Sequence, residues 1–328
     1  MQRVLSGSVF IEGLQTGQMD LIRSAAKTDL HNHACLGYRL ERLREHIGNH
    51  IPPVPERMPD FESFVDYLRA YLHPHIYTRE GFEFSIREAM REAVHDGVTH
   101  LEMSIDAQMY EVYGSAEPLI AFLDACAADF SALTFWPEIG VNREWEPARA
   151  EQLVLPLIDS GYFQSIDLYG NEKFGPPETF RPMYQSARAQ QMLLKAHAGE
   201  FRDAEYVRRS VEVLELDEVQ HGIAAANSPE VMRWLADHDI ALHVCPTSNV
   251  RLSRVSAIRV HPIRKLVDAG VRVTINSDDI MIFGQTAGQE YLNLFQAGVL
   301  TAEELDAIRV RALQSRDVES ALSFTPNA

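Results

Sequence analysis

The chain has 328 residues, of which 46% are hydrophobic, and a formal net charge of −17 at pH 7. A surface this acidic repels phosphate backbones, so we expect no nucleic acid partner, although a nucleotide-sized ligand could still occupy a pocket. Three cysteines are too few for a disulfide framework, and no segment has the pattern of a signal peptide or a membrane span. We therefore expect a cytoplasmic protein that does not bind membranes.

After an N-terminal extension at residues 1–26, eight strand-like runs alternate with helix-like segments. This alternation implies right-handed crossovers and a parallel sheet. Eight units favour a closed (β/α)8 TIM barrel over an open doubly wound sheet. No internal boundary is visible, so we expect residues 1–328 to form a single domain. The predicted strands lie at 27–33, 99–105, 133–141, 162–170, 192–198, 217–222, 240–246 and 271–278.

A helix is predicted after the first strand, behind the proline-rich segment IPPVPERMPD. Phe61, Phe64, Leu68 and Tyr71 recur there at helical spacing. Two interpretations remain open. The helix could pack on the barrel, or residues 52–75 could form a helical lid that closes over a ligand and excludes water.

The unusual polar residues all fall at the carboxyl ends of predicted strands. In a parallel barrel those ends meet at one mouth, where active sites are built. One such histidine could be a hydrogen-bonded core residue, but that interpretation does not explain the whole set. In chain order the residues are His31, His33, His197, His221, Asp278 and Asp279.

His31 and His33 form a His-x-His pair directly after an apolar run. Residues two apart in a strand point to the same side, so both imidazoles would enter one space. Imidazole is the commonest protein ligand for zinc. Two partly buried, hydrogen-bonded histidines are the alternative. The other histidines at the same mouth favour a shared metal site.

Five segments in this order resemble the adenosine/AMP deaminase family of the amidohydrolase superfamily: DLHNH, KAHAGE, QHG, VCPTSN and INSDD. The resemblance runs from about Asp29 to beyond Phe283. It implies a TIM barrel that holds one zinc ion and hydrolytically removes the 6-amino group of a purine, releasing ammonia. The implied partner is a small aminopurine or an analogue.

The resemblance also implies the ligands of the metal. His31, His33 and His197 would supply nitrogen and Asp278 oxygen, and Asp278 also counts among the catalytic residues. Such a site acidifies a water molecule and makes it a usable nucleophile. Iron or cobalt could occupy the same ligands.

Four further roles follow from matching family positions. Glu200 would protonate N1 of the purine, His221 would orient or deprotonate the water, Asp279 would hold N7, and the N–H of Gly170 would meet N3. For Glu200, Asp279 and Gly170, a purely structural role is the alternative. Glu200 could cap the following helix, Asp279 could orient a ligand histidine, and Gly170 could simply form a turn.

Cys35 marks a departure from the family. Adenosine-specific members usually carry an aspartate at this position, which contacts the ribose 5′-hydroxyl, and adenine-specific relatives usually carry glutamate. A thiol is a poor acceptor. The substrate therefore stays open among a nucleoside, a base, a nucleotide and another fused aminopyrimidine. Arg39 could meet an anionic tail or be a solvated helix residue. Ile280 replaces a common proline without touching a proposed ligand.

Two other functions compete with a purine aminohydrolase. A metal-dependent amidohydrolase or phosphoesterase could use the same barrel, but many of these need a lysine on the fourth strand, and residues 162–170 contain none. A catalytically silent purine-binding barrel is the second alternative, although every matched catalytic position is filled. The signature of cytidine-type zinc deaminases is absent. The sequence leaves the oligomeric state open.

Overall fold

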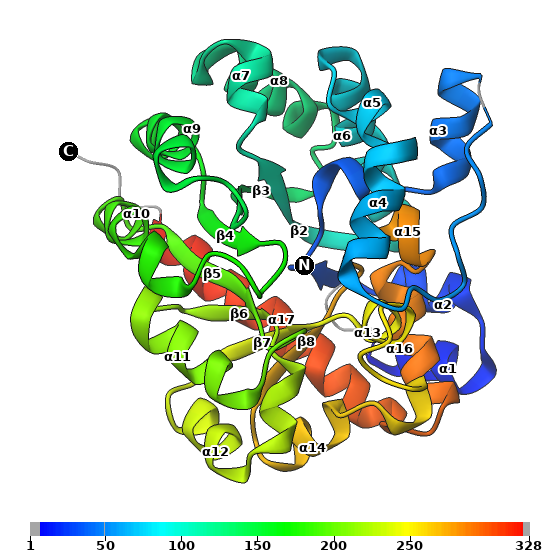
Figure 1. Ribbon diagram of the computed structural model, residues 1–328. Coiled ribbons are helices and arrows are strands. Elements are labelled where there is room, and N and C mark those ends of the chain that lie inside the picture. Colours follow the sequence, from blue (N-terminus) through cyan, green and yellow to red (C-terminus); the bar gives the residue numbers. More distant parts are fainter. Residues whose placement is uncertain (1–6, 49, 324–328) are drawn as a thin grey trace.

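The computed structural model describes residues 7–48 and 50–323. Eight parallel strands follow one another in sequence order around a central axis, and helices surround them (Figure 1). This arrangement confirms the predicted α/β barrel. The strands are β1 (Lys27–Asp29), β2 (Val98–Asp106), β3 (Thr134–Asn142), β4 (Ser165–Tyr169), β5 (Leu193–Ala198), β6 (Glu218–His221), β7 (Ala241–Val244) and β8 (Arg272–Ile275).

Most helices connect consecutive strands, as a barrel of βα units requires. Short 3₁₀ turns, η1 (Ala34–Leu36), η2 (Ile223–Asn227) and η3 (Ile258–Val260), lie in the loops. The helices are α1 (Gly7–Thr16), α2 (Met19–Ser24), α3 (Leu40–Ile47), α4 (Phe61–Tyr71), α5 (His73–Ile76), α6 (Arg79–Asp96), α7 (Met109–Tyr113), α8 (Ala116–Asp129), α9 (Pro147–Asp159), α10 (Pro177–Ala189), α11 (Ala204–Leu214), α12 (Pro229–Asp237), α13 (Pro246–Arg251), α14 (Ile263–Asp268), α15 (Ile280–Phe283), α16 (Ala287–Gln296) and α17 (Ala302–Ser323).

Local sequence signals set several helix ends. Ser228 caps α12 by accepting a hydrogen bond from the N–H of Val231 at 3.3 Å, with Pro229 in the first helical position. Asp60 caps α4 in the same way through the N–H of Ser63. Gly97 ends α6 in the left-handed conformation, with φ +81°, where a Cβ would be strained. These ends are therefore determined by residues within a few positions of them.

Closure of the barrel differs from the predicted pattern of strands. The strand expected at 27–33 ends at Asp29, and β8 ends at Ile275. Side chains and one backbone hydrogen bond, from the N–H of Asp278 to the carbonyl of His31 at 2.9 Å, complete the join between the two segments. The N–H of Leu30 donates to Asn276 Oδ1 at 2.9 Å, and the N–H of Ser277 donates to Asp29 Oδ1 at 3.1 Å. Because side chains replace part of the ladder, the segment that carries the two histidines leaves regular strand geometry.

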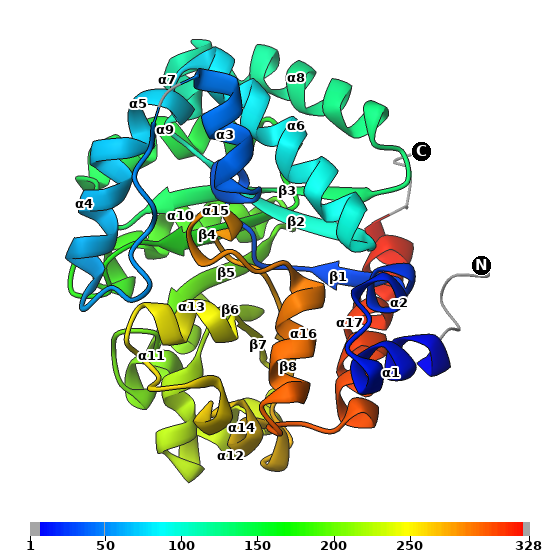
Figure 2. The same ribbon diagram turned by 90° about the vertical axis from the view of Figure 1, so that its right-hand side faces the viewer.

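The N-terminal extension and the last helix lie together. Figure 2 shows α1 and α2 beside α17, next to β1. Arg309 of α17 donates to the carbonyl of Ala26, just before β1, at 2.5 Å. Among the described residues, no helix combines the length and the apolar character that crossing a membrane requires.

Candidate active site

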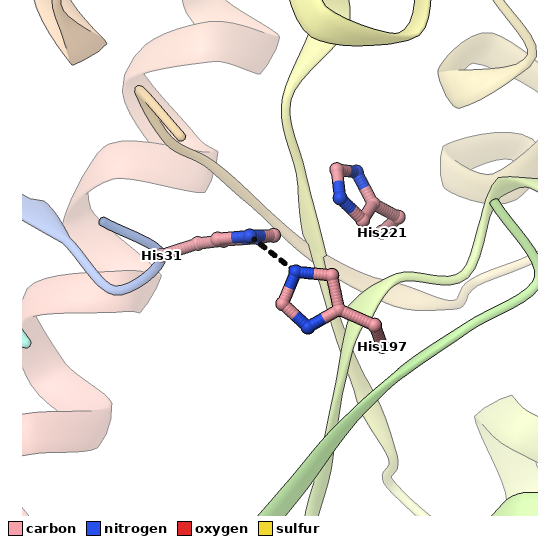
Figure 3. A group of neighbouring side chains, drawn as sticks. All are labelled: His31, His197 and His221. Atoms are coloured by element: carbon pink, nitrogen blue, oxygen red, sulfur yellow. Dashed lines mark hydrogen bonds between the residues drawn. The ribbon is translucent and has the colours of Figure 1, made fainter. Parts of the chain in front are cut away.

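Four side chains from separate parts of the sequence converge at the carboxyl ends of the strands. His31 Nε2 lies 3.1 Å from His197 Nε2, and His33 Nε2 lies 3.3 Å from the same atom. Asp278 Oδ1 lies 3.6 Å from His33 Nε2 and 3.9 Å from His31 Nε2. In Figure 3 the rings of His31, His197 and His221 are turned toward one another. The structure therefore brings together all four predicted metal ligands.

This donor set fits a divalent metal ion. Burial lowers the pKa of both His31 and His197 and favours the neutral imidazole, the form that binds metals. The opposite ring nitrogens already have partners. His197 Nδ1 lies 3.1 Å from Asp167 Oδ1, and His31 Nδ1 lies 3.3 Å from the carbonyl of His243. Such outer partners fix the orientation of metal-binding histidines. Three imidazoles and one carboxylate suit zinc.

His221 and Asp278 have unusual backbone conformations. Their φ angles are +63° and +60°, in the left-handed region that non-glycine residues rarely adopt. The turn at each strand end points both side chains into the same space, with His221 Nε2 3.7 Å from Asp278 Oδ2. Strain of this kind concentrates at functional sites.

Glu200 is buried beside His221, with its Oε2 atom 3.5 Å from His221 Nε2. Burial, with the nearby Asp278 carboxylate, raises its pKa well above the usual value. Its other oxygen, Oε1, has no hydrogen-bond partner among the described residues. Asp203 caps α11, so the alternative that Glu200 serves as that cap is wrong. A carboxyl group that keeps its proton in a dry pocket can act as a general acid.

Backbone hydrogen bonds hold the loop that carries Glu200. The buried carboxylate of Glu172, from the loop after β4, accepts from the N–H groups of Gly199, Glu200, Phe201 and Arg202 at 2.9 to 3.3 Å. Four donors on one carboxylate are enough to fix the loop. The sequence patterns did not identify Glu172. Its place three residues after the end of β4 is the only local signal.

The other predicted substrate-binding residues line the same pocket. Asp279 has a buried Oδ1 without a partner among the described residues, and it makes no hydrogen bond to a ligand histidine there. Gly170 has φ +103°, and a Cβ would come within 3.1 Å of Asn142 Oδ1. Cys35 is buried, and burial raises the pKa of its thiol, so it stays uncharged. The side chain at position 35 therefore offers no carboxylate to a sugar hydroxyl, and the nearby Asp106 carboxylate already accepts hydrogen bonds from two tyrosines.

The pocket encloses about 760 Å³, including the part that opens to solvent. Helix α4 forms one wall through Phe61, Phe64 and Leu68, which confirms the helix expected in this region. The ring of Phe64 stacks on Phe283 at a centroid distance of 6.2 Å. Tyr71 is 41% exposed and does not contribute to the pocket. The apolar face of α4 therefore forms one wall of the pocket.

Sequence reasoning missed four polar residues of the pocket, Tyr77, Ser104, Asp106 and Tyr169. Asp106 ends β2 and accepts hydrogen bonds from Tyr77 at 3.0 Å and Tyr169 at 2.6 Å. Ser104, two residues earlier, has a buried hydroxyl with no partner among the described residues. Asp106, Ser104 and Tyr169 all lie near strand ends, so the rule that identified the histidines could have found them. Asp106 already holds two hydroxyl groups, whereas Ser104 remains available.

Arg39 does not reach the pocket. Its guanidinium donates to Glu92 at 2.9 Å, to the carbonyl of Gly284 at 2.9 Å and to Gln289 at 2.8 Å. These bonds tie the start of α3 to α6 and to the segment after α15. Arg39 therefore neither contacts an anionic tail nor is simply solvated. It holds these three segments together.

Known proteins are similar to this chain over most of its length. A profile of the adenosine deaminase family matches residues 41–322. A Treponema pallidum protein named as an adenosine/adenine deaminase is 35% identical over 302 residues, covering 89% of this chain and 99% of its own length. An adenine deaminase from Cupriavidus taiwanensis is 31% identical over 269 residues, covering 80% of this chain and 74% of its own length.

Solved structures show the same fold. The crystal structure of an adenine deaminase from Arthrobacter aurescens has a TM-score of 0.75 and 25% identity, over 87% of this chain and 93% of its own. An amidohydrolase from Burkholderia ambifaria, with bound zinc, has a TM-score of 0.71 and 20% identity, over 92% and 93%.

The family profile, the curated relatives and the barrel fold identify the chain as a hydrolase that catalyses deamination. The chain belongs to the adenosine deaminase family.

Proposed function

We propose that the protein is a zinc-dependent hydrolase that removes the amino group of a 6-aminopurine and releases ammonia. The observation that carries this proposal is the position of Glu200, which lines the same pocket as His197 and Asp278 and has a buried carboxyl oxygen without a hydrogen-bond partner among the described residues. His31, His33, His197 and Asp278 would hold the ion. Bound zinc would lower the pKa of a water molecule and make it a nucleophile at neutral pH.

The remaining residues bind the purine and move its protons. Glu200 Oε1 would donate a proton to N1, which makes the neighbouring carbon easier to attack. Asp279 Oδ1 would meet N7 and Gly170 would meet N3, each at an edge of the ring. The phenyl rings of α4 would cover the purine and keep bulk water out. Together these contacts position the carbon that bears the amino group beside the ligand cluster.

The uncharged thiol of Cys35 supports a substrate without a hydroxyl group to be recognised by this residue. Leu36 and Ile76 also line this part of the pocket. Similarity to adenine deaminases points the same way, toward the free base or an analogue with an apolar substituent, ahead of adenosine itself. A second candidate is another fused amino-heterocycle, because the Ser104 hydroxyl is unpartnered among the described residues and could recognise a group that adenine lacks.

Ammonia release from a panel of compounds tests the proposal. The panel contains adenine, adenosine, 5′-deoxy and 5′-substituted adenosines, AMP, and aminated pterins. The zinc-loaded protein is expected to act on adenine or a 5′-apolar analogue. Glu200→Gln should lower kcat by at least about 100-fold, with zinc content unchanged, whereas the exposed Glu205→Gln should match the wild type. Silence on every compound with zinc bound would point to a purine-binding barrel.

A further inference from the structure

The structure contains a buried chain of three side chains that leads away from the candidate active site. His221 Nδ1 lies 3.2 Å from Asn249 Nδ2, in α13. Asn249 Oδ1 lies 3.2 Å from His261 Nε2, which follows η3. All three side chains are buried, with exposed fractions of 2% or less. Neither Asn249 nor His261 lines the substrate pocket, so any role in the reaction must act through His221.

One backbone group fixes the direction of every hydrogen bond in this chain. The N–H of Ile263 donates to His261 Nδ1 at 3.1 Å, and an amide N–H can only donate. Burial lowers the pKa of His261 to about 3, so its ring is neutral and carries a single proton. That proton must therefore reside on Nε2, which donates to Asn249 Oδ1.

The same logic passes through the amide to His221. Because Asn249 Oδ1 is the acceptor from His261, its Nδ2 group must face His221 and donate to Nδ1. A neutral imidazole that accepts at Nδ1 carries its proton on Nε2. Independently, His221 Nε2 faces two oxygens, Glu200 Oε2 at 3.5 Å and Asp278 Oδ2 at 3.7 Å, which suit a donor.

We propose that Asn249 and His261 are positioning residues that hold His221 in the Nε2–H tautomer. In that form His221 donates a hydrogen bond toward the attacking oxygen and orients it, and it does not take the proton from the water. This inference rests on the proposed function for its catalytic meaning, but the tautomer itself can be measured without a substrate.

Nitrogen-15 spectra of imidazole-labelled, zinc-loaded protein provide the first test. The ring nitrogen without a proton resonates far downfield of the protonated one, and spectra of His221→Gln assign the His221 signals. We expect Nδ1 of His221 to be the downfield nitrogen. A downfield Nε2 would overturn the proposal whether or not any aminopurine is a substrate.

A pair of substitutions at His261, isosteric with each other, provides the second test. His261→Gln keeps a donor toward Asn249, whereas His261→Glu offers only acceptors, turns the Asn249 amide around and should move the proton to Nδ1 of His221. We expect His261→Glu to lower kcat roughly 100-fold with little change in KM, and His261→Gln to recover most of this loss. The exposed His238→Glu, just after α12, controls for the added charge.

Asn249→Asp tests the same step if His261→Glu fails to fold. Its carboxylate still accepts from His261 but cannot donate to His221, so the tautomer and kcat should change as for His261→Glu, with zinc retained. Unchanged His221 spectra and an unchanged kcat in the folded acceptor-only variant would overturn the proposal. If the tautomer of His221 changes in these variants but the wild type acts on no compound, the role of Asn249 and His261 is upheld and only the proposed function is contradicted.

Discussion

Cys35 sits in the pocket wall where the family resemblance places a charged residue in many relatives. Its thiol is buried, and burial together with the nearby Asp106 carboxylate raises its pKa, so it contributes no charge to the site. The motif that predicted the metal ligands cannot predict the substrate at this position. Substrate choice depends on which hydrogen-bonding groups in a pocket are left unpaired.

Cys35→Asp should move specificity toward adenosine. A new acceptor for a sugar hydroxyl contributes about 1.4 kcal/mol, or roughly tenfold in the ratio of kcat/KM for adenosine to that for adenine. The ratio is measured by ammonia release, and Cys35→Asn serves as the uncharged control. An unchanged ratio in a folded, zinc-containing variant would mean that a sugar lies against another wall.

Glu172 acts on Glu200 by holding its backbone and, through its charge, by helping to raise the pKa of the Glu200 carboxyl group. Glu172→Gln replaces one oxygen with an NH₂ group that faces two N–H donors, so the loop should lose up to about 1–3 kcal/mol of stabilisation. We expect lower kcat together with a lower free energy of unfolding in urea. Glu178→Gln, an exposed carboxylate paired with Arg209, is the matched control. Equal activity in the two variants would show that the loop keeps its shape without this carboxylate.

At the scale of elements, α4 decides how the pocket meets solvent. The segment before it is anchored, since the N–H of Met58 donates to the carbonyl of Arg251 at 2.7 Å and Arg251 donates to the carbonyl of Pro55 at 2.6 Å. The apolar residues of α4 line the pocket, where a purine would meet them. We propose that α4 acts as a lid around these fixed points.

Hydrogen exchange measures this proposed motion. Adenine added to the zinc-loaded Glu200→Gln protein, which should bind it without consuming it, is expected to slow amide exchange in residues 61–71. Exchange in α12, which lies outside the pocket, should stay constant and serves as the internal control. Protection that is equal with and without a bound ligand would describe α4 as a static wall.

At the scale of the whole molecule, a buried charge cluster joins the last helix to the barrel interior. Lys195 contacts Glu102 and lies 2.9 Å from Glu138. Arg316 of α17 lies 2.5 Å from Glu102 and 2.8 Å from Glu218. Residues of β2, β3, β5 and β6 thereby depend on a helix that begins only after the last strand of the barrel. We propose that residues 1–328 unfold as one domain because these buried ion pairs link the last helix to the strands.

Arg316→Met should be strongly destabilising. Removing one partner from a buried ionic cluster typically costs about 3–5 kcal/mol, because the remaining carboxylates stay buried with less compensation. Urea unfolding of the zinc-saturated protein should show one transition, shifted to lower urea. The exposed Arg311→Met on the same helix should leave the midpoint nearly unchanged. Two separate transitions would contradict a single cooperative domain.

The sequence alone predicted the barrel and the convergence of the proposed metal ligands at one mouth, for a physical reason. Strand and helix periodicities are local, and parallel strands bring their carboxyl ends to one mouth, so polar residues at those ends must meet. His197, His221 and Asp278 could be placed together in this way from their positions along the chain. The same reasoning did not foresee that β1 would end before His31, where the side chains of Asp29 and Asn276 and a single backbone bridge between Asn32 and Asp278 take the place of a regular ladder with β8.

Only the tertiary structure decided which partners each polar group finds. No local pattern relates the residues that bond to one another here. Four N–H groups donate to Glu172, and a path of hydrogen bonds runs from Ile263 through His261 and Asn249 to His221. The structure also shows that Glu200 Oε1 has no partner among the described residues. Hydrogen-bond direction depends on the orientation of neighbours in space, and burial sets the pKa of each acid. These features therefore exist only once the barrel has folded and has brought distant residues together.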